Sequence, residues 1–130
     1  MSNDRRTIDA DAAPAAVGPY SHAVQAGGLL FCSGQIPLDP ATGEIVGDTP
    51  ADQARRCLAN LQIVCKAAGT TLADAVRCTV YMTDLSAFAE VNEVYAEFFP
   101  SEPPARAAVG VTALPKGALV EIDAIVAVSG

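Results

Sequence analysis

The stretch from Thr49 to Gly69 constrains the fold most strongly, because it carries helix signals at both ends and a helical apolar pattern between them. Thr49 is a candidate N-cap, Pro50 suits the first helical position, and Gly69 suits the C-terminal stop. The apolar residues of one helical stripe are Ala54, Cys57, Leu58, Leu61, Cys65 and Ala68. We therefore expect an amphipathic helix that packs one face on another layer.

Strand-like patterns occupy five further segments, which are residues 21–26, 29–33, 76–83, 105–111 and 119–128. Gly27-Gly28 separates the first two and predicts a hairpin turn, and a turn at 114–117 joins the last two. A second helix is expected from about Leu85 to Phe99, and Pro103-Pro104 ends it. This order predicts an α+β, two-layer sandwich with one sheet and two helices on one face.

The last strand segment carries apolar residues on both of its faces. Its alternate residues Ile122, Ala124, Val126 and Val128 would meet the helices, whereas Ile125 points the other way. Because residues 29–32 are also apolar on both faces, a two-layer domain would leave an apolar sheet face exposed. We expect another subunit to cover it.

Length and charge restrict the class of protein. The 130 residues fit one domain, 1–130, and the 51% hydrophobic content excludes intrinsic disorder. No apolar run approaches the ~20 residues needed to cross a bilayer, and no secretory signal is recognised, so a cytoplasmic protein is expected. A net charge of −7 opposes binding of nucleic-acid phosphates.

The metal-ligating residue types are few and badly spaced for a metal site. The four cysteines, Cys32, Cys57, Cys65 and Cys78, form no CxxC pair, and His22 is the one histidine. We expect all four thiols to be reduced core residues and no metal to be bound. His22 is expected at the surface or at a turn edge rather than in a Ser-His-acid triad. Without a phosphate-binding loop or HExxH motif, no cofactor is expected.

A few charged residues lie in otherwise apolar surroundings. Arg106 is the only charge between Glu102 and Lys116, and its planar fork could bind a carboxylate bidentately. An edge-strand arginine paired with a surface acid is an equal alternative. Glu121 and Asp123 share one face of the last strand. If that strand pairs with the Arg106 strand, a carboxylate and a guanidinium meet in one cleft; the commoner alternative is a plain ion pair.

The segment Ser33-Gly34 ends a buried strand, and its glycine permits close approach of the backbone to a ligand. Ser33 could instead form a local hydrogen bond. Spacing alone therefore indicates a carboxylate-binding cleft and leaves catalysis open.

Several blocks of the sequence together carry a family resemblance. They are Gly18-Pro19-Tyr20-Ser21, Ser33-Gly34-Gln35-Ile36-Pro37, Asp39-Pro40 with Thr42-Gly43-Glu44, Val91-Asn92-Glu93-Val94-Tyr95, Pro104-Ala105-Arg106, and Leu114-Pro115-Lys116-Gly117 through Val120-Glu121-Ile122. From about Ala13 to Val128 the chain resembles the Rid (YjgF-type) family of reactive intermediate deaminases.

The resemblance implies a chorismate-mutase-like fold with one mixed sheet, assembled as a homotrimer with clefts between subunits. It also implies hydrolysis of 2-enamine and 2-imino acids, such as 2-iminobutanoate, 2-iminopropanoate or 2-aminoacrylate, to 2-keto acids and ammonia without a cofactor. Two alternatives remain open. One is a small-metabolite-binding regulatory or chaperone-like trimer without turnover, and the other is an endoribonuclease or translation inhibitor, which the net charge opposes.

The resemblance also implies roles for individual residues. Arg106 would hold the substrate carboxylate, and Glu121 would position or polarise the attacking water. The other positions that match the substrate-binding cleft are Tyr20, Ser33, Gly34, Asn92, Ala107 and Ala108, some of them contributed by a neighbouring subunit. Many relatives have Gln in place of His22 and some have Cys in place of Ala108. Because the family contact at Ala108 is made by the backbone, its expected role is unchanged.

Overall fold

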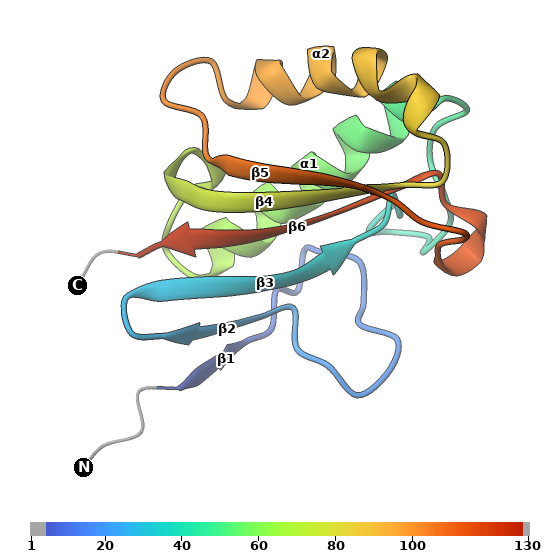
Figure 1. The fold of residues 1–130 in the computed structure, drawn as a ribbon. Helices are drawn as coiled ribbons and strands as arrows, with labels where there is room; N and C mark the ends of the chain where they lie inside the picture. Colours follow the sequence, from blue (N-terminus) through green and yellow to red (C-terminus); the bar gives the residue numbers. More distant parts are fainter. Residues whose placement is uncertain (1–4, 129–130) are drawn as a thin grey trace.

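Six strands form one sheet in the computed structural model, which describes residues 5–128 (Figure 1). The strands are β1 (Arg6–Ile8), β2 (Ala23–Ala26), β3 (Leu29–Gln35), β4 (Ala75–Met82), β5 (Ala105–Gly110) and β6 (Val120–Ala127). Their order across the sheet is β1-β2-β3-β6-β4-β5, and only the β4–β5 pair is parallel. The predicted α+β class with one mixed sheet is therefore confirmed, whereas β1 was not anticipated.

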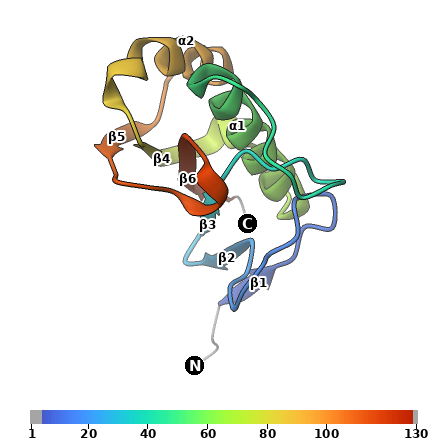
Figure 2. The same ribbon diagram turned by 90° about the vertical axis from the view of Figure 1, so that its right-hand side faces the viewer.

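Both helices cover the same face of the sheet, as Figure 2 shows. They are α1 (Pro50–Ala67) and α2 (Phe88–Phe98), accompanied by short 3₁₀ turns η1 (Leu72–Asp74), η2 (Leu85–Ala87) and η3 (Pro115–Gly117). The Thr49 side chain accepts a hydrogen bond from the backbone N–H of Asp52 at 3.1 Å, so the predicted N-cap is confirmed. Neither helix, within the described chain, is long and apolar enough to cross a membrane.

The core lies between the helices and the sheet. On β6 the alternate residues Ile122, Ala124 and Val126 are buried against the helices, as their spacing predicted, and Val128 is partly buried there. Val120, on the same face, is buried as well. From α1, Leu58 and Leu61 are fully buried, and each such side chain contributes about 1.5–3 kcal/mol relative to exposure. All four cysteines are buried and free, which confirms their assignment as core thiols.

The position of β6 differs from one arrangement considered from the sequence. It lies between β3 and β4 and does not pair with β5. Because β4, α2 and β5 form a parallel crossover unit, β5 takes the edge of the sheet on the far side of β4. The apolar β6, which buries one face completely, takes the centre. Residues of β5 and β6 are consequently separated by a whole strand.

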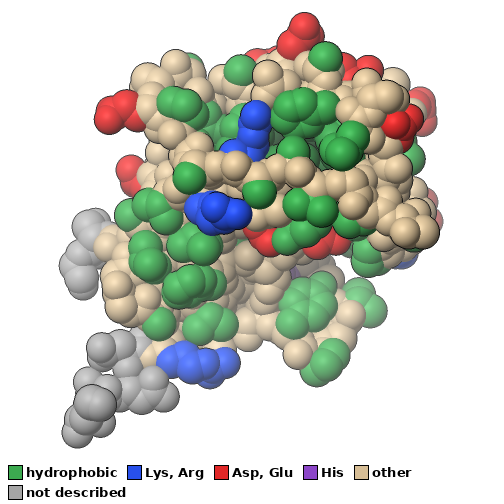
Figure 3. Space-filling model, in the orientation of Figure 1, with side chains coloured by type: hydrophobic (Ala, Val, Ile, Leu, Met, Phe, Trp, Pro, Cys, Tyr) green, Lys and Arg blue, Asp and Glu red, His purple; other side chains and the backbone are tan. Residues whose placement is uncertain are grey.

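The second face of the sheet is not covered by the described residues. Phe31 on β3 and Val109 on β5 remain 44% and 39% exposed there. The space-filling view in Figure 3, in the orientation of Figure 1, shows hydrophobic side chains spread over this face with basic groups between them. We call it the open face. Its apolar character agrees with the expectation that another subunit covers it.

Candidate active site

Arg106 lies at the sheet edge on β5, on the side of the helices. It is in register with the buried Cys78 of β4, so its side chain points toward α2. One guanidinium nitrogen donates a hydrogen bond to Oδ1 of Asn92 at 2.7 Å. The guanidinium carbon also lies 5.0 Å from the ring centroid of Phe88 and 4.8 Å from that of Tyr95.

Three residues of α2 therefore hold the Arg106 side chain: Phe88, Asn92 and Tyr95, which share one helical face at a spacing of four and three. The aromatic rings attract the cation through their faces. Within residues 5–128 no carboxylate pairs with Arg106, so the remaining guanidinium N–H groups are free to bind an anion. The alternative of a surface ion pair is wrong for the described chain. A pocket of about 370 Å³ lies beside it.

Glu121 lies on β6 and points to the open face. It is in register with Tyr81 of β4 and is half-buried. Its side chain lies directly over Gly34 of β3, because a Cβ atom at Gly34 would be only 2.9 Å from Cδ of Glu121 and 3.2 Å from Cγ. Any side chain at position 34 would therefore displace the Glu121 carboxylate, which is the movable end of that side chain.

The protein environment of Glu121 favours the protonated carboxyl group more than full exposure to water would. Burial, and then the negative charge of Asp123, raise the pKa of Glu121 above its usual value. No donor within the described residues forms a hydrogen bond with the Glu121 carboxylate. It is therefore available to a ligand or to water as an acceptor with increased basicity.

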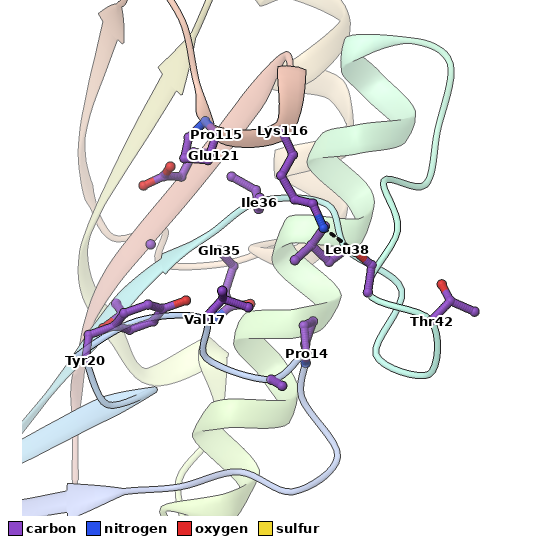
Figure 4. A pocket seen from close by; sticks show the side chains of 14 residues that line it. Pro14, Val17, Tyr20, Gln35, Ile36, Leu38, Thr42, Pro115, Lys116 and Glu121 are labelled. Atoms are coloured by element: carbon purple, nitrogen blue, oxygen red, sulfur yellow. Dashed lines mark hydrogen bonds between the residues drawn. The ribbon is translucent and has the colours of Figure 1, made fainter.

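A pocket of about 750 Å³ opens beside Glu121. Four of the residues expected in the cleft line it: Tyr20, Ser33, Gly34 and Glu121. Figure 4 shows the Tyr20 ring and the Glu121 carboxylate on either side of the β3 strand end, with the Lys116 chain crossing the pocket. The Lys116 ammonium donates a hydrogen bond to the carbonyl of Gly43 at 2.8 Å. The Ser33 hydroxyl donates a hydrogen bond to the carbonyl of Ser21, which lies before β2, at 2.6 Å.

The two groups of residues do not meet within one copy of the chain. The Arg106 side chain points to the helix side of the sheet, Glu121 points to the open face, and β4 lies between their strands. The single cleft considered from the sequence would have needed β5 and β6 to pair, which they do not. We call the group of Arg106 and Asn92 the basic half-site and the group of Tyr20, Ser33, Gly34 and Glu121 the acidic half-site.

Ala107 and Ala108 follow Arg106 on the same edge strand. By register with Thr79 and Val80 of β4, Ala107 faces the open side and Ala108 the helix side. Since β5 pairs only with β4 in the described chain, the backbone groups on its outer edge have no strand partner. Such groups are suited to binding a ligand by backbone hydrogen bonds.

His22 is buried, so its expected place at the surface is wrong, although it lies in a bend directly before β2. It is 3% exposed, its Nδ1 accepts a hydrogen bond from the backbone N–H of Ala10 at 2.9 Å, and its Nε2 donates to the carbonyl of Pro14 at 2.8 Å. Both ring nitrogens are thus used to hold the segment before β2. Because Pro14 lines the larger pocket, His22 supports the wall of the acidic half-site.

Two further features were missed by the sequence analysis. The contact of Arg106 with the rings of Phe88 and Tyr95 was not anticipated, although the shared helical face of Phe88, Asn92 and Tyr95 could have indicated it. The segment around Pro14 carries no pattern that would place it at a pocket. Among residues 5–128, no cluster of three His, Cys, Asp or Glu side chains is arranged to hold a metal ion.

Comparison with known proteins identifies the family. A family model described as Endoribonuclease L-PSP matches residues 10–128. The chain belongs to this family. It includes proteins called Rid, so the resemblance drawn from the sequence is confirmed. Among the relatives is Protein DfrA of Myxococcus xanthus, which is 55% identical over 123 residues, covering 93% of this chain and 94% of that protein.

Two other members of the Rid family bear on function. The 2-iminobutanoate/2-iminopropanoate deaminase of Bos taurus is 46% identical over 121 residues, covering 93% of this chain and 88% of the bovine protein. The crystal structure of RidA from an Antarctic Psychrobacter species superposes with a TM-score of 0.89 at 48% identity, over 95% of this chain and 99% of that one. Imine deamination is thus an activity named within the family.

Proposed function

We propose that this protein hydrolyses 2-imino acids and their enamine tautomers to 2-keto acids and ammonia. The observation that carries the proposal is the restrained Arg106 guanidinium, which keeps free N–H groups and has no carboxylate partner in the described chain. The named activity of the bovine relative supports the same reaction. An α-imino carboxylate is the kind of small anion that a planar guanidinium binds bidentately.

The chemistry needs orientation more than strong activation. With the carboxylate bound at Arg106, a water molecule held by Glu121 attacks the imine carbon, and Glu121 accepts a proton from that water. A carbon–oxygen bond forms as the C=N π pair moves to nitrogen, which takes up a proton. The hydroxyl proton of the tetrahedral carbinolamine is then transferred to its amino nitrogen, so that ammonia leaves as the oxygen forms the carbonyl. One water is consumed for each imine.

We further propose that each site forms between neighbouring subunits of a homotrimer. The basic half-site of one subunit, with the backbone at Ala107 and Ala108, would face the acidic half-site of the next. Support comes from the opposite orientation of Arg106 and Glu121, from their complementary charges, and from the apolar open face. Light scattering should give a mass of three 13.3 kDa chains, and a monomer at micromolar concentration would contradict the assembly.

An imine generated in place tests the activity. A purified amino-acid dehydratase releases the enamine, and the rate at which 2-keto acid appears is compared with and without this protein. We expect acceleration over spontaneous hydrolysis, loss of acceleration in Arg106→Ala, and full activity in Lys66→Ala, which removes one positive charge from the exposed side of α1. If the wild type bound 2-keto acids without accelerating the reaction, the regulatory alternative would replace this proposal.

RNA cleavage, which the family description names, has little support in this chain. A net charge of −7 opposes phosphate binding. The one histidine, a common acid–base group, is buried with both ring nitrogens engaged. RNA binding that persisted at moderate salt would restore that alternative.

A further inference from the structure

The open face holds a second acid beside Glu121 that the proposed reaction does not use. Asp123 follows Glu121 by two residues on β6, so both side chains point to the same side of the sheet. The Tyr81 hydroxyl donates a hydrogen bond to Oδ2 of Asp123 at 3.0 Å, and the backbone N–H of Thr79 donates to Oδ1 at 3.2 Å. Both oxygens of Asp123 are thus anchored to β4.

The direction of the Tyr81 hydroxyl is informative. Tyr81 is the register partner of Glu121, yet its hydroxyl binds Asp123 two residues further along β6. The arrangement leaves Glu121 without a competing donor in the described chain and fixes a negative charge about 7 Å along the strand from it. The same charge is one of the two causes that raise the pKa of Glu121.

Few other titratable or charged groups surround Glu121 in the described residues. They are Tyr81 on β4, Lys116 in η3, Tyr20 before β2 and, across the sheet, Cys57 on α1. Beside Asp123, Arg77 of β4 lines the same small pocket of the open face. From β3, Gly34 lies directly beneath the Glu121 side chain, and the Ser33, Gly34 and Gln35 residues that line the same pocket are not titratable. The Lys116 ammonium is bound to the carbonyl of Gly43. Among residues 5–128, Asp123 is therefore the carboxylate whose charge acts on Glu121 from the same face of the sheet.

We propose that Asp123 is a positioning residue for the proposed hydrolysis: anchored by Tyr81 and Thr79, it fixes a negative charge that makes Glu121 a better acceptor of the water proton. The inference rests on the function proposed above. A nearby like charge disfavours the ionised carboxylate, so Glu121 binds a proton more strongly once water begins to release it. Rates of proton transfer rise with the strength of the base while that base remains ionised at the working pH.

Titration of Glu121 by carboxyl ¹³C NMR tests the electrostatic part without any activity assay. The Glu121 resonance is assigned by its loss in Glu121→Gln. Asp123→Asn should lower the Glu121 midpoint by about 0.5 to 1 pH unit. Asp74→Asn is the matched control, because Asp74 precedes Ala75, which pairs with Val126 far along β6 from Glu121. In Asp74→Asn the Glu121 midpoint should equal that of the wild type.

Two additional measurements keep the test decisive if Asp123→Asn does not fold. Asp123→Ser removes the charge with a smaller side chain that still accepts a hydrogen bond, and it should lower the midpoint similarly. In the wild type, molar salt should lower the Glu121 midpoint, because it screens the charge of Asp123. An unchanged Glu121 midpoint in a folded neutral variant would overturn the proposal.

The pH profile of imine hydrolysis then tests the catalytic part. Because Glu121 acts as a base, activity falls as the pH drops through its pKa. We expect the acidic limb of kcat/KM to move to lower pH in Asp123→Asn, with reduced kcat at neutral pH, and to stay in place in Asp123→Glu. If the wild type were active but the acidic limb of kcat/KM did not move in Asp123→Asn, the role of Asp123 would be refuted and the proposed hydrolysis would stand. A wild type that accelerates no hydrolysis would refute the proposed function, whatever the NMR midpoints.

Discussion

Subunit mixing gives the sharpest prediction, because Arg106 and Glu121 point to opposite sides of one sheet. Arg106→Ala chains lack the basic group but keep Glu121, and Glu121→Gln chains have the reverse defect. Each variant alone should lose ~10²-fold or more in turnover. In a randomly mixed, closed ring built from equal amounts, each group is intact on about half of the subunits, so about a quarter of the sites are complete.

The assay is steady-state imine hydrolysis on a sample co-refolded from both variants, with mixed oligomers verified by native mass spectrometry. We expect about 25% of wild-type kcat per chain and an unchanged KM, since the restored sites are wild type in composition. The matched control mixes Arg106→Ala with the Arg106→Ala/Glu121→Gln double variant, which can form no complete site. If verified mixed oligomers were no more active than the separate variants, the idea of a shared site would be refuted.

Four further substitutions address single contacts. Arg106→Lys should weaken 2-keto acid binding ~10-fold or more by calorimetry, because an ammonium cannot form the bidentate fork; equal affinity would contradict that binding mode. Phe88→Leu removes one aromatic face from the guanidinium and should weaken the same binding by about 2- to 30-fold, given ~0.5–2 kcal/mol for such a contact. Gly34→Ala should abolish turnover with little loss of thermal stability, because the new Cβ displaces the Glu121 carboxylate. The control Gly27→Asn, at a turn with open space around it, should remain active. His22→Leu should lower the free energy of unfolding by about 2–5 kcal/mol in urea titrations, because a buried N–H and a buried C=O lose their partner. His22→Gln should recover part of the lost stability. An unchanged free energy of unfolding in His22→Leu would show that these hydrogen bonds contribute nothing.

The sequence by itself determined the local structure. The cap at Thr49, the apolar stripe of α1 and the stop near Gly69 are short-range signals, and the helix begins and ends where they predict. The alternation on β6 likewise fixed which of its residues enter the core, because strand side chains alternate with a period of two. Gly34 could be recognised from the sequence as a position where the backbone permits close approach, although the Glu121 carboxylate that lies over it could not.

Only the tertiary structure decided which strands are neighbours, and with them the geometry of the site. The alternation near Arg106 and Glu121 is compatible with either strand order, because period two says which residues share a face and not which strand lies alongside. The parallel crossover through α2 placed β5 at the edge and β6 in the centre, which puts β4 between the two charges. The registers of Arg106 with Cys78 and of Glu121 with Tyr81 then turn the two charges to opposite sides of the sheet. His22 was misplaced for the same physical reason: its burial comes from the segment at Ala10–Pro14, whose distant contacts leave no periodic trace in the sequence.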